Sequence, residues 1–181
     1  MHAIATRERS PRGGPSRVVR RPTASIRPIE ASDAAALSVF YAALSPESRR
    51  RRFLGSGVGL SDAVASRMAG VDHRTADGYV AVLAEAGASD GEIIGHLCLE
   101  PCGEGLNEVA VAVADRFHGQ GIGRRLMREA VASARRRGLH GLRASLFHEN
   151  TAMRRLLVGT GVPVTRTGND GAILEVALPI G

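Results

Sequence analysis

Lysine is absent from this sequence, and aromatic residues are scarce. The 181 residues carry 24 basic side chains, all of them arginine, against 18 acidic ones, for a formal net charge of +6. There is no tryptophan, and four phenylalanines and two tyrosines offer little surface on which nucleic-acid bases could stack. No apolar run approaches the roughly 20 residues that a membrane-spanning helix needs. The composition therefore excludes a transmembrane protein and disfavours a nucleic-acid binder that works by base stacking.

Cysteine is limited to Cys98 and Cys102. Their spacing fits neither paired zinc-binding knuckles nor a redox Cys-x-x-Cys motif. The histidines show neither a His-Glu-x-x-His motif nor a clustered spacing; they are His2, His73, His96, His118, His140 and His148. We expect free thiols in a cytoplasmic protein, and no metal site.

The positive charge is concentrated at the start of the chain. Residues 1–24 hold six arginines and one acid, a net charge of +5, whereas residues 25–181 hold 18 arginines and 17 acids, a net charge of +1. Because the first segment is rich in proline and glycine and has few large apolar side chains, it cannot bury enough surface to offset the entropy lost on ordering. We expect a disordered arm over 1–24, either solvated or touching acidic partners, and one domain over 25–181. A domain charge near +1 argues against a dedicated nucleic-acid surface.

Periodicity and breaker residues predict a mixed α/β domain. Three β-rich runs in the middle of the chain are separated by glycine-containing turns, which is the spacing of an antiparallel meander. Apolar residues then recur at helical spacing from Ile122, and arginines followed by Gly138 close that helix. The expected strands cover 25–29, 79–84, 93–100, 106–113 and 142–147, with a last hairpin of 164–166 and 173–178; the expected helices cover 34–44, 46–53, 61–68, 122–137 and 150–158.

The most informative segment runs from the strand at 109–113 into the helix at Ile122, through His-Gly-Gln-Gly-Ile-Gly at 118–123. Glycines at a strand-to-helix turn let the backbone approach an anion, and the unpaired N–H groups of the first helical turn point at it. A Walker loop would need Gly-Lys-Ser/Thr, and a dinucleotide fingerprint would need a third glycine; both are missing. The segment therefore predicts a phosphate site of another kind, with a tight turn that binds nothing as the alternative.

This segment resembles the acetyl-CoA loop of the GNAT superfamily of N-acetyltransferases, whose pattern is Gln/Arg-x-x-Gly-x-Gly/Ala. His118 stands in the Gln/Arg place, and Gly121 and Gly123 match. The resemblance implies a GNAT fold, in the α/β (α+β) class, with a mixed central sheet of about six to seven strands flanked by helices. It also implies that acetyl-CoA is the cosubstrate, that the backbone at 111–113 pairs with its pantetheine arm, and that the amides at 119–124 hold its pyrophosphate. The implied cofactor-binding residues are Val111, Ala112, Val113, His118, Gly119, Gln120, Gly121, Ile122, Gly123, Arg124, Asn150 and Met153.

Further along, Asn150, Met153 and Leu156 resemble the Asn-x-x-Ala-x-x-Leu-Tyr segment of the same superfamily. The tyrosine of that pattern is a possible acid for the departing thiolate. Leu157 stands in its place here, so that role does not carry over.

A narrower resemblance is to the catalytic domains of bacterial protein-lysine acetyltransferases that modify acyl-CoA synthetases. It rests on Leu-Ser-Pro-Glu-Ser from Leu44, followed by Arg52-Phe53, on Asn-Glu-Val-Ala-Val at 107–111, and on Asn150 with Met153. This resemblance implies that the acceptor is a lysine on a protein, with an acyl-CoA synthetase as the leading class.

Direct attack of an amine on a thioester needs a base, because the amine is protonated at neutral pH. We expect Glu108 to be this base, since it lies on the strand that would hold the thioester and the narrower resemblance places a glutamate there. The alternative for Glu108 is an ordinary strand carboxylate, and Glu149 and His148 are other candidates for the base. The arginines at 49–52 form either a solvated face or a surface that docks an acidic acceptor.

The sequence thus predicts an enzyme that moves acetyl from acetyl-CoA to a primary amine, a protein lysine, by direct attack and without a covalent enzyme intermediate. A small-amine acetyltransferase, acting on a polyamine or an aminoglycoside, is the alternative among enzymes. A basic nucleic-acid-binding or scaffold protein with an inert glycine loop is the alternative in another class. Monomer and homodimer both stay open.

Overall fold

A single mixed sheet organises the part of the chain that the structure describes. The computed structural model describes residues 24–55, 61–83, 91–103 and 105–180. Over these residues seven strands form the order β1-β2-β3-β4-β5-β7-β6, and the β4–β5 pair alone is parallel. The strands are β1 (Ala24–Pro28), β2 (Asp77–Leu83), β3 (Ile93–Gly103), β4 (Leu106–Val113), β5 (Gly141–Phe147), β6 (Thr165–Asp170) and β7 (Ile173–Pro179).

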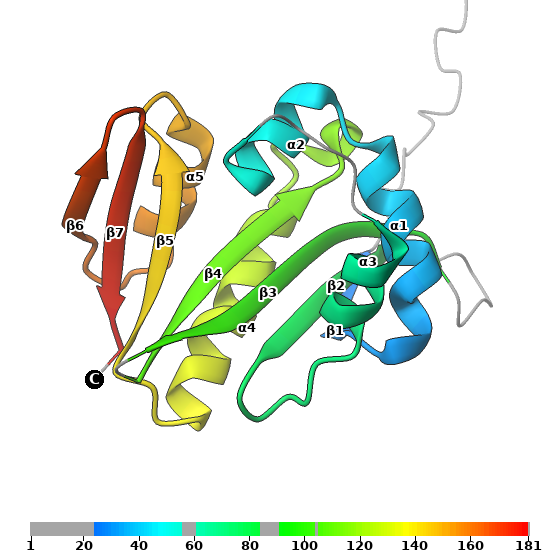
Figure 1. Ribbon diagram of the computed structural model, residues 1–181, viewed down its shortest axis with the longest axis horizontal. Helices are drawn as coiled ribbons and strands as arrows, with labels where there is room; N and C mark the ends of the chain where they lie inside the picture. The colour runs from blue at the N-terminus through cyan, green and yellow to red at the C-terminus, as the bar shows by residue number, and fades with distance from the viewer. Residues whose placement is uncertain (1–23, 56–60, 84–90, 104, 181) are drawn as a thin grey trace, which may run out of the picture.

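Helices cover both faces of this sheet (Figure 1). The helices α1 (Ala34–Ala43), α2 (Pro46–Phe53) and α3 (Asp62–Ala69) lie on one face. The helices α4 (Ile122–Arg136) and α5 (Thr151–Val158) lie on the other. Two 3-10 turns complete the helical elements of the described residues, η1 (Ala31–Asp33) and η2 (Asp115–Phe117).

The long helix α4 is the amphipathic helix that the sequence predicted. Its buried side chains Leu126 and Met127 lie in one apolar cluster with Leu97 of β3 and Leu142 of β5. Burial of a side chain of this size stabilises the fold by about 1.5–3 kcal/mol. Gly138, with a φ of +64°, lets the chain leave the helix at its end. Burial of the apolar stripe therefore fixes the start of α4 against the sheet, where the glycine loop enters.

The strands β4 and β5 part soon after they meet. They pair only from Leu106 to Glu108 on β4, opposite Gly141 to Arg143 on β5. Beyond that point β4 stays with β3 through Val113, opposite Gly95, while β5 stays with β7 through Phe147. Figure 1 shows the two strands diverging from the lower end of the sheet. The divergence leaves one edge of β4 without a partner strand.

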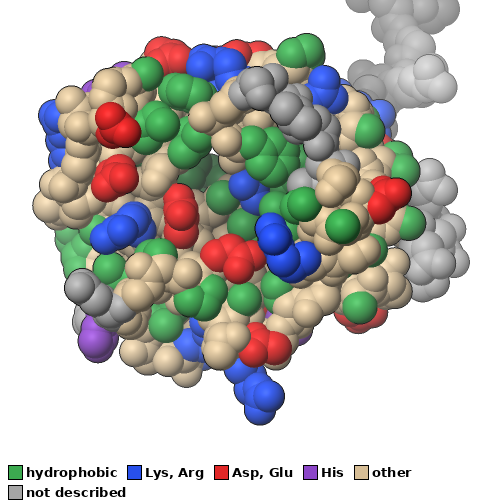
Figure 2. Space-filling model, viewed as in Figure 1, with side chains coloured by type: hydrophobic (Ala, Val, Ile, Leu, Met, Phe, Trp, Pro, Cys, Tyr) green, Lys and Arg blue, Asp and Glu red, His purple; other side chains and the backbone are tan. Residues whose placement is uncertain are grey.

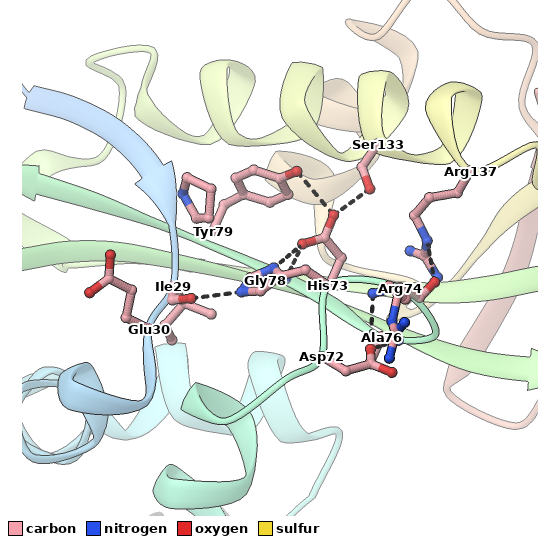
Figure 3. A network of polar contacts seen from close by, with 12 residues as sticks. Ile29, Glu30, Asp72, His73, Arg74, Ala76, Gly78, Tyr79, Ser133 and Arg137 are labelled. Atoms are coloured by element: carbon pink, nitrogen blue, oxygen red, sulfur yellow. Dashed lines mark hydrogen bonds and ion pairs between the residues drawn. The ribbon is translucent and has the colours of Figure 1, made fainter.

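A buried carboxylate ties three elements together at the start of β2 (Figure 3). Asp77 accepts hydrogen bonds from His73 Nδ1 at 2.7 Å, from the Tyr79 hydroxyl at 3.0 Å and from the Ser133 hydroxyl of α4. The other ring nitrogen of His73 bonds the carbonyl oxygen of Ile29, 2.9 Å away. Burial would raise the pKa of Asp77, but these hydrogen bonds outweigh it and hold the pKa below its ordinary value. The network joins the end of β1, the loop before β2 and α4.

The predicted mixed sheet of six to seven strands flanked by helices is confirmed, as are the central meander and the order of elements. The last hairpin differs in detail: its first strand was expected over 164–166, whereas β6 spans Thr165–Asp170, with a register shift between Arg166 and Gly168. Residues 1–23 lie outside the described part, so the disordered arm stays a prediction, while Ala24 is the first residue of β1. In the described part, no helix is long and apolar enough to cross a membrane.

Candidate active site

A pocket of about 480 Å³ opens where β4 parts from β5. Four parts of the chain line it: β4, the glycine loop with the first turn of α4, the end of β5 with the start of α5, and α2. The lining residues are Ser48, Arg51, Arg52, Val109, Ala110, Val111, Ala112, Val113, Phe117, His118, Gly119, Gly121, Ile122, Gly123, Arg124, Ser145, Leu146, Asn150, Ala152, Met153, Arg155 and Leu156. This list contains every cofactor-binding residue that the sequence predicted except Gln120.

The edge of β4 offers backbone groups to this pocket. The N–H of Ala114 donates to the Ile94 carbonyl of β3, 2.9 Å away. Because backbone groups alternate in direction along a strand, those of Val111 and Val113 point away from β3, into the gap that β5 leaves. The backbone of Ala112 pairs with β3, so Ala112 contributes only its side chain to the wall. A ligand with peptide-like amides can therefore pair with β4 as a further strand would.

The glycine loop closes one end of the pocket. Gly119 and Gly121 have φ values of +74° and +83°, which side-chain-bearing residues rarely adopt, and nothing lies within 4 Å of where a Cβ would be at either position. The first backbone bond of α4 here runs from the Arg125 N–H to the Gly121 carbonyl, so the preceding N–H groups are free to bind an anion. The arrangement is that of an anion site at a helix N-terminus.

Two side chains of this loop are already engaged. His118 Nε2 bonds the Val113 carbonyl oxygen at 2.9 Å, which ties the loop to the end of β4. The Gln120 side chain donates to the Arg116 carbonyl at 3.1 Å. The His118 ring therefore serves to fix the loop, and a contribution of Gln120 to an anion site would come from its backbone.

The start of α5 forms the opposite wall. The Asn150 carboxamide accepts from the Met153 N–H at 3.0 Å and caps the helix, while both residues line the pocket. Leu157, in the place of the superfamily tyrosine, is buried in the core. Its neighbour Leu156 faces the pocket instead and packs within 3.6 Å of where a Cβ on Gly123 would lie.

Glu108 lies on the face of the sheet that carries α1, α2 and α3, next to the pocket-lining Val109. It is half-buried and does not itself line the pocket. Glu100 of β3 and Arg143 of β5 are its neighbours in register on either side. Figure 2 shows this face, with acidic and basic side chains over the middle of the sheet and a hollow between α2 and β5. A carboxylate at Glu108 can thus meet an amine that arrives over this face.

The other two candidates for the base are used elsewhere. Glu149 forms an exposed ion pair with Arg50, 2.7 Å away. His148 Nε2 lies 2.6 Å from the Asn169 side-chain oxygen. Neither residue lines the pocket.

A cluster of four polar side chains lies above β3 on the same face as Glu108. The Arg52 Nε donates to the Tyr41 hydroxyl at 3.1 Å, and Arg52 Nη2 donates to the Cys98 Sγ at 3.1 Å. The Tyr41 hydroxyl in turn lies 2.9 Å from Nδ1 of His96. Burial raises the pKa of Tyr41 to about 12, lowers the pKa of His96 to about 3, and raises the pKa of the Cys98 thiol. The cluster therefore carries one charge, that of Arg52.

Comparison with known proteins identifies the family. A model described as the acetyltransferase (GNAT) family matches residues 41–159. The chain belongs to the GNAT family. Acetyltransferase PA5475 of Pseudomonas aeruginosa is 32% identical to this GNAT protein over 148 residues, which cover 80% of this chain and 77% of that protein.

Solved GNAT structures share the fold. The GNAT domain of S. lividans PAT superposes with a TM-score of 0.75 at 27% identity, over 86% of this chain and 90% of that chain. The structure of yncA from Salmonella typhimurium, solved with its cofactor acetyl-CoA, gives a TM-score of 0.65 at 19% identity, over 87% of this chain and 94% of that chain.

As a GNAT acetyltransferase, this protein uses acetyl-CoA, and the pocket fits that cosubstrate. The open β4 edge suits the amides of pantetheine, and the glycine loop suits a pyrophosphate. Arg124 of α4 and Arg155 of α5 both line the pocket and bring two cations to it. Within the described ranges, no group of three or more His, Cys, Asp and Glu residues is placed to hold a metal ion.

Several residues that line the pocket were not predicted from the sequence. Arg155 and Ser145 line the pocket where β5 diverges from β4. No local sequence pattern predicts that divergence. Arg52 was expected on a solvated face or a docking surface, but it reaches into the sheet to Cys98, 46 residues away. The doublet Arg154-Arg155 inside a predicted helix was the one available signal for a basic wall.

Proposed function

We propose that this acetyltransferase moves acetyl from acetyl-CoA to the side-chain amine of a lysine on a protein, with an acyl-CoA synthetase as the leading class of acceptor. Glu108 acts as the general base. A cytoplasmic location is part of the proposal, because both cysteines are free thiols. The observation that carries it is the position of Glu108 beside the point where β4 leaves β5.

The residues of the pocket would bind and orient the cosubstrate. The backbone of Val111 and Val113 would hold the pantetheine arm, and the amides that precede Arg125 would hold the pyrophosphate. The cosubstrate supplies an acetyl group activated as a thioester. Held this way along β4, its reactive end is expected near Val109, on the same strand as Glu108.

Glu108 would take up the proton that the acceptor loses. Glu108 would first accept a proton from the acceptor ammonium, which frees the lone pair of the nitrogen. The nitrogen then bonds to the acetyl carbon as the carbon–sulfur bond breaks. The second proton that the nitrogen loses goes to the departing sulfur, and CoA leaves as the thiol. In the described part of the chain, Glu108 has no ion pair, and its neighbours on the sheet are Glu100 and Arg143. It is therefore free to meet an incoming amine.

The case for a protein lysine rests on the narrower sequence resemblance and on the shape of the acceptor side. Glu108 lies on a sheet face that is open beside α2, so a side chain carried by a larger partner can reach it. The arginines at 49–52, expected as a solvated face or as a docking surface for an acidic acceptor, carry less unpaired charge than their number indicates, because Arg50 and Arg51 both form ion pairs with Glu47. Charge repulsion of a polyamine is therefore only a small part of the argument for a protein acceptor.

The test is acetyl transfer from labelled acetyl-CoA to purified acyl-CoA synthetases and, in parallel, to polyamines and aminoglycosides. Because the chain contains no lysine, any label found on lysine by mass spectrometry belongs to the acceptor. We expect lysine labelling of a synthetase that depends on Glu108. Robust turnover of a small amine with no labelled protein would overturn the acceptor proposal and leave the acetyltransferase assignment in place.

A further inference from the structure

We propose that Arg52 forms an anion subsite beside Glu108, so that the preferred acceptor presents a carboxylate close to its reacting amine. The carboxylate would be either an acidic side chain next to the acceptor lysine or a free α-carboxylate. This inference names a feature of the acceptor and rests on the proposed function of the same site.

Arg52 differs from the three arginines that precede it. Arg50 is paired with Glu47 and Glu149, and Arg51 with Glu47. Arg49 donates to the Ala42 carbonyl in the last turn of α1, at the negative end of that helix. Among the residues that the structure describes, no carboxylate lies within ion-pairing distance of Arg52.

The partners that Arg52 does have are neutral. It donates to the Tyr41 hydroxyl and to the Cys98 thiol, and burial keeps both protonated at physiological pH. These contacts use Nε and Nη2, while Nη1 has no hydrogen bond to any described residue. A half-buried guanidinium held by neutral groups lacks the counter-charge that such a cation normally has. Because Arg52 lines the pocket, a ligand can supply that charge.

The phosphates of acetyl-CoA are not placed to supply it. Cys98, which anchors Arg52, is paired with Ala110, whereas the glycine loop follows Val113. Three residues of strand separate these positions by about 10 Å. The guanidinium thus lies at the level where the thioester and the acceptor would meet, and the anion it binds would come from the acceptor.

Arg52 and Glu108 lie on the same face of the sheet and close together. Ala110 is two residues from Glu108, so Cys98 and Glu108 are diagonal neighbours on β3 and β4, a spacing of about 7–8 Å. Glu108 is near enough to act on Arg52 electrostatically without pairing with it. Side by side, the two residues offer one negative and one positive group, which complements an ammonium and a carboxylate on a single acceptor.

The experiment compares acceptors that differ only in one charge. One arm uses lysine peptides with aspartate or asparagine at each position next to the lysine. The second arm uses Nα-acetyl-lysine against its carboxamide. We expect kcat/KM to favour the carboxylate member of a pair by roughly tenfold or more, because hydrogen bonds between charged groups are the stronger ones. The first arm detects an acidic side chain and the second an α-carboxylate. No preference in either arm for the wild-type enzyme overturns the proposal without any variant being made.

Variants then assign the preference to Arg52. Arg52→Gln should abolish it, and Arg52→Lys should keep part of it, since the charge is retained. Arg51→Gln is the matched control: it removes a pocket-lining charge that is already paired with Glu47, and the ratio between the two acceptors should stay as in the wild type. Folding is checked by circular dichroism and acetyl-CoA affinity. If Arg52→Gln lowers the rate for both acceptors equally, Arg52 serves the reacting centre rather than the acceptor anion, and the proposal is wrong.

Failure of the proposed function would give results that differ from those expected if the Arg52 subsite alone were wrong. If Glu108→Gln leaves transfer unchanged, the base assignment falls, while the ratio between charged and neutral acceptors still reports on Arg52. If lysine acceptors are inactive and small amines are acetylated, the same comparison is made with amines that carry or lack a carboxylate. The ratio of their kcat/KM values then decides whether Arg52 forms an anion subsite.

Discussion

Glu108 and Glu100 face each other across β3 and β4, and only one of them is expected to act in the reaction. Two carboxylates at directly opposed positions of an antiparallel pair repel each other, so the arrangement costs stability unless a cation comes between them. Glu100 is exposed, whereas Glu108 is half-buried and adjoins the pocket wall at Val109. Because the surroundings differ, Glu100 can serve as the control for Glu108: Glu108 is the carboxylate expected to react, and Glu100 is not.

Replacing Glu108 by glutamine should lower the rate of transfer at neutral pH by about 100-fold or more, because the amide cannot accept the proton of the acceptor amine. Acetyl-CoA affinity should stay as in the wild type, since Glu108 does not line the pocket. Steady-state kinetics and calorimetry measure the two quantities. The control is Glu100→Gln, which should change the rate little. An unchanged pH-rate profile in Glu108→Gln would assign the proton to another group or to water.

At the scale of elements, the start of α2 is hydrogen-bonded to η2, the 3-10 turn that precedes the glycine loop. Asp115 of η2 accepts from the Ser45 N–H at 2.9 Å, from the Ser45 hydroxyl at 2.7 Å and from the Ser48 hydroxyl at 2.7 Å. Ser45 is also the N-cap of α2 and accepts from the N–H of Ser48. Because α2 carries Arg52, this clamp sets the acceptor side of the pocket relative to the glycine loop.

Asp115→Ala should therefore loosen α2. We expect a loss of about 1–2 kcal/mol in the free energy of unfolding, modest for three hydrogen bonds because the Asp115 side chain is exposed to water. Thermal unfolding measures this, at about 2–4 °C per kcal/mol for a chain of this length. The matched control is Asp62→Ala, an acidic residue at the start of α3 with one hydrogen bond, from Ser38. Equal effects of the two substitutions would contradict the clamp.

The helices, the strands and the glycine loop were predictable from the sequence because each depends on residues that are close together in the chain. Apolar periodicity marked α4, and β-rich runs marked the meander. Glycines before Ile122 marked the turn into α4, where the anion site is proposed. The divergence of β4 and β5 was not predictable, since it depends on which strands pair across the chain. For the same reason a run of four arginines looked uniform. In the structure Arg52 contacts Tyr41 and Cys98, Arg50 and Arg51 pair with carboxylates, and Arg49 donates to the Ala42 carbonyl.

For the whole molecule, buried or clamped carboxylates connect distant parts of the chain. Asp77 joins β2 to α4 and, through His73, to Ile29 just after β1, and Asp115 joins α2 to η2, which precedes the glycine loop. Asp33 accepts two hydrogen bonds of 2.7 Å from Arg27, which hold its pKa below the ordinary value. At Asp115, burial would raise the pKa, but the hydrogen bonds from Ser45 and Ser48 lower it to about 2. The same contacts that shape the site thus make stability depend on pH.

Acid should destabilise the protein within a defined window. A carboxylate whose pKa is lower in the folded than in the unfolded state stabilises the fold above its unfolded value, 3.8 for aspartate, and this contribution is lost as the pH falls through the folded value. We expect the melting temperature to fall most steeply between about pH 4 and pH 2. Asp115→Ala should flatten part of that slope. A melting temperature that is constant across the window would contradict these pKa shifts.

Removal of residues 1–23 should leave both the melting temperature and acetyl-CoA affinity close to those of the full chain, because the composition of that segment offers little to a core. Ala24 must be kept, since it pairs with Leu83 and its carbonyl accepts from Arg125 at 2.7 Å. A truncation through Pro28, which deletes β1, is the control and should lower the melting temperature strongly. A comparable loss in the shorter truncation would show that the arm packs on the domain.

The central claim is that acetyl-CoA lies between β4 and α5 with its pyrophosphate on the glycine loop. The most direct measurement is a calorimetric titration of acetyl-CoA into the wild type, Gly121→Glu and Gly171→Glu. Both glycines have positive φ and open space around them, so each substitution places a side chain on a left-handed backbone, but Gly171 lies in the turn between β6 and β7 and not in the pocket. We predict that Gly121→Glu weakens binding by roughly tenfold or more, through bulk and charge at the phosphate position, while Gly171→Glu binds as the wild type does. A folded Gly121→Glu protein that binds acetyl-CoA as tightly as the wild type would contradict the account.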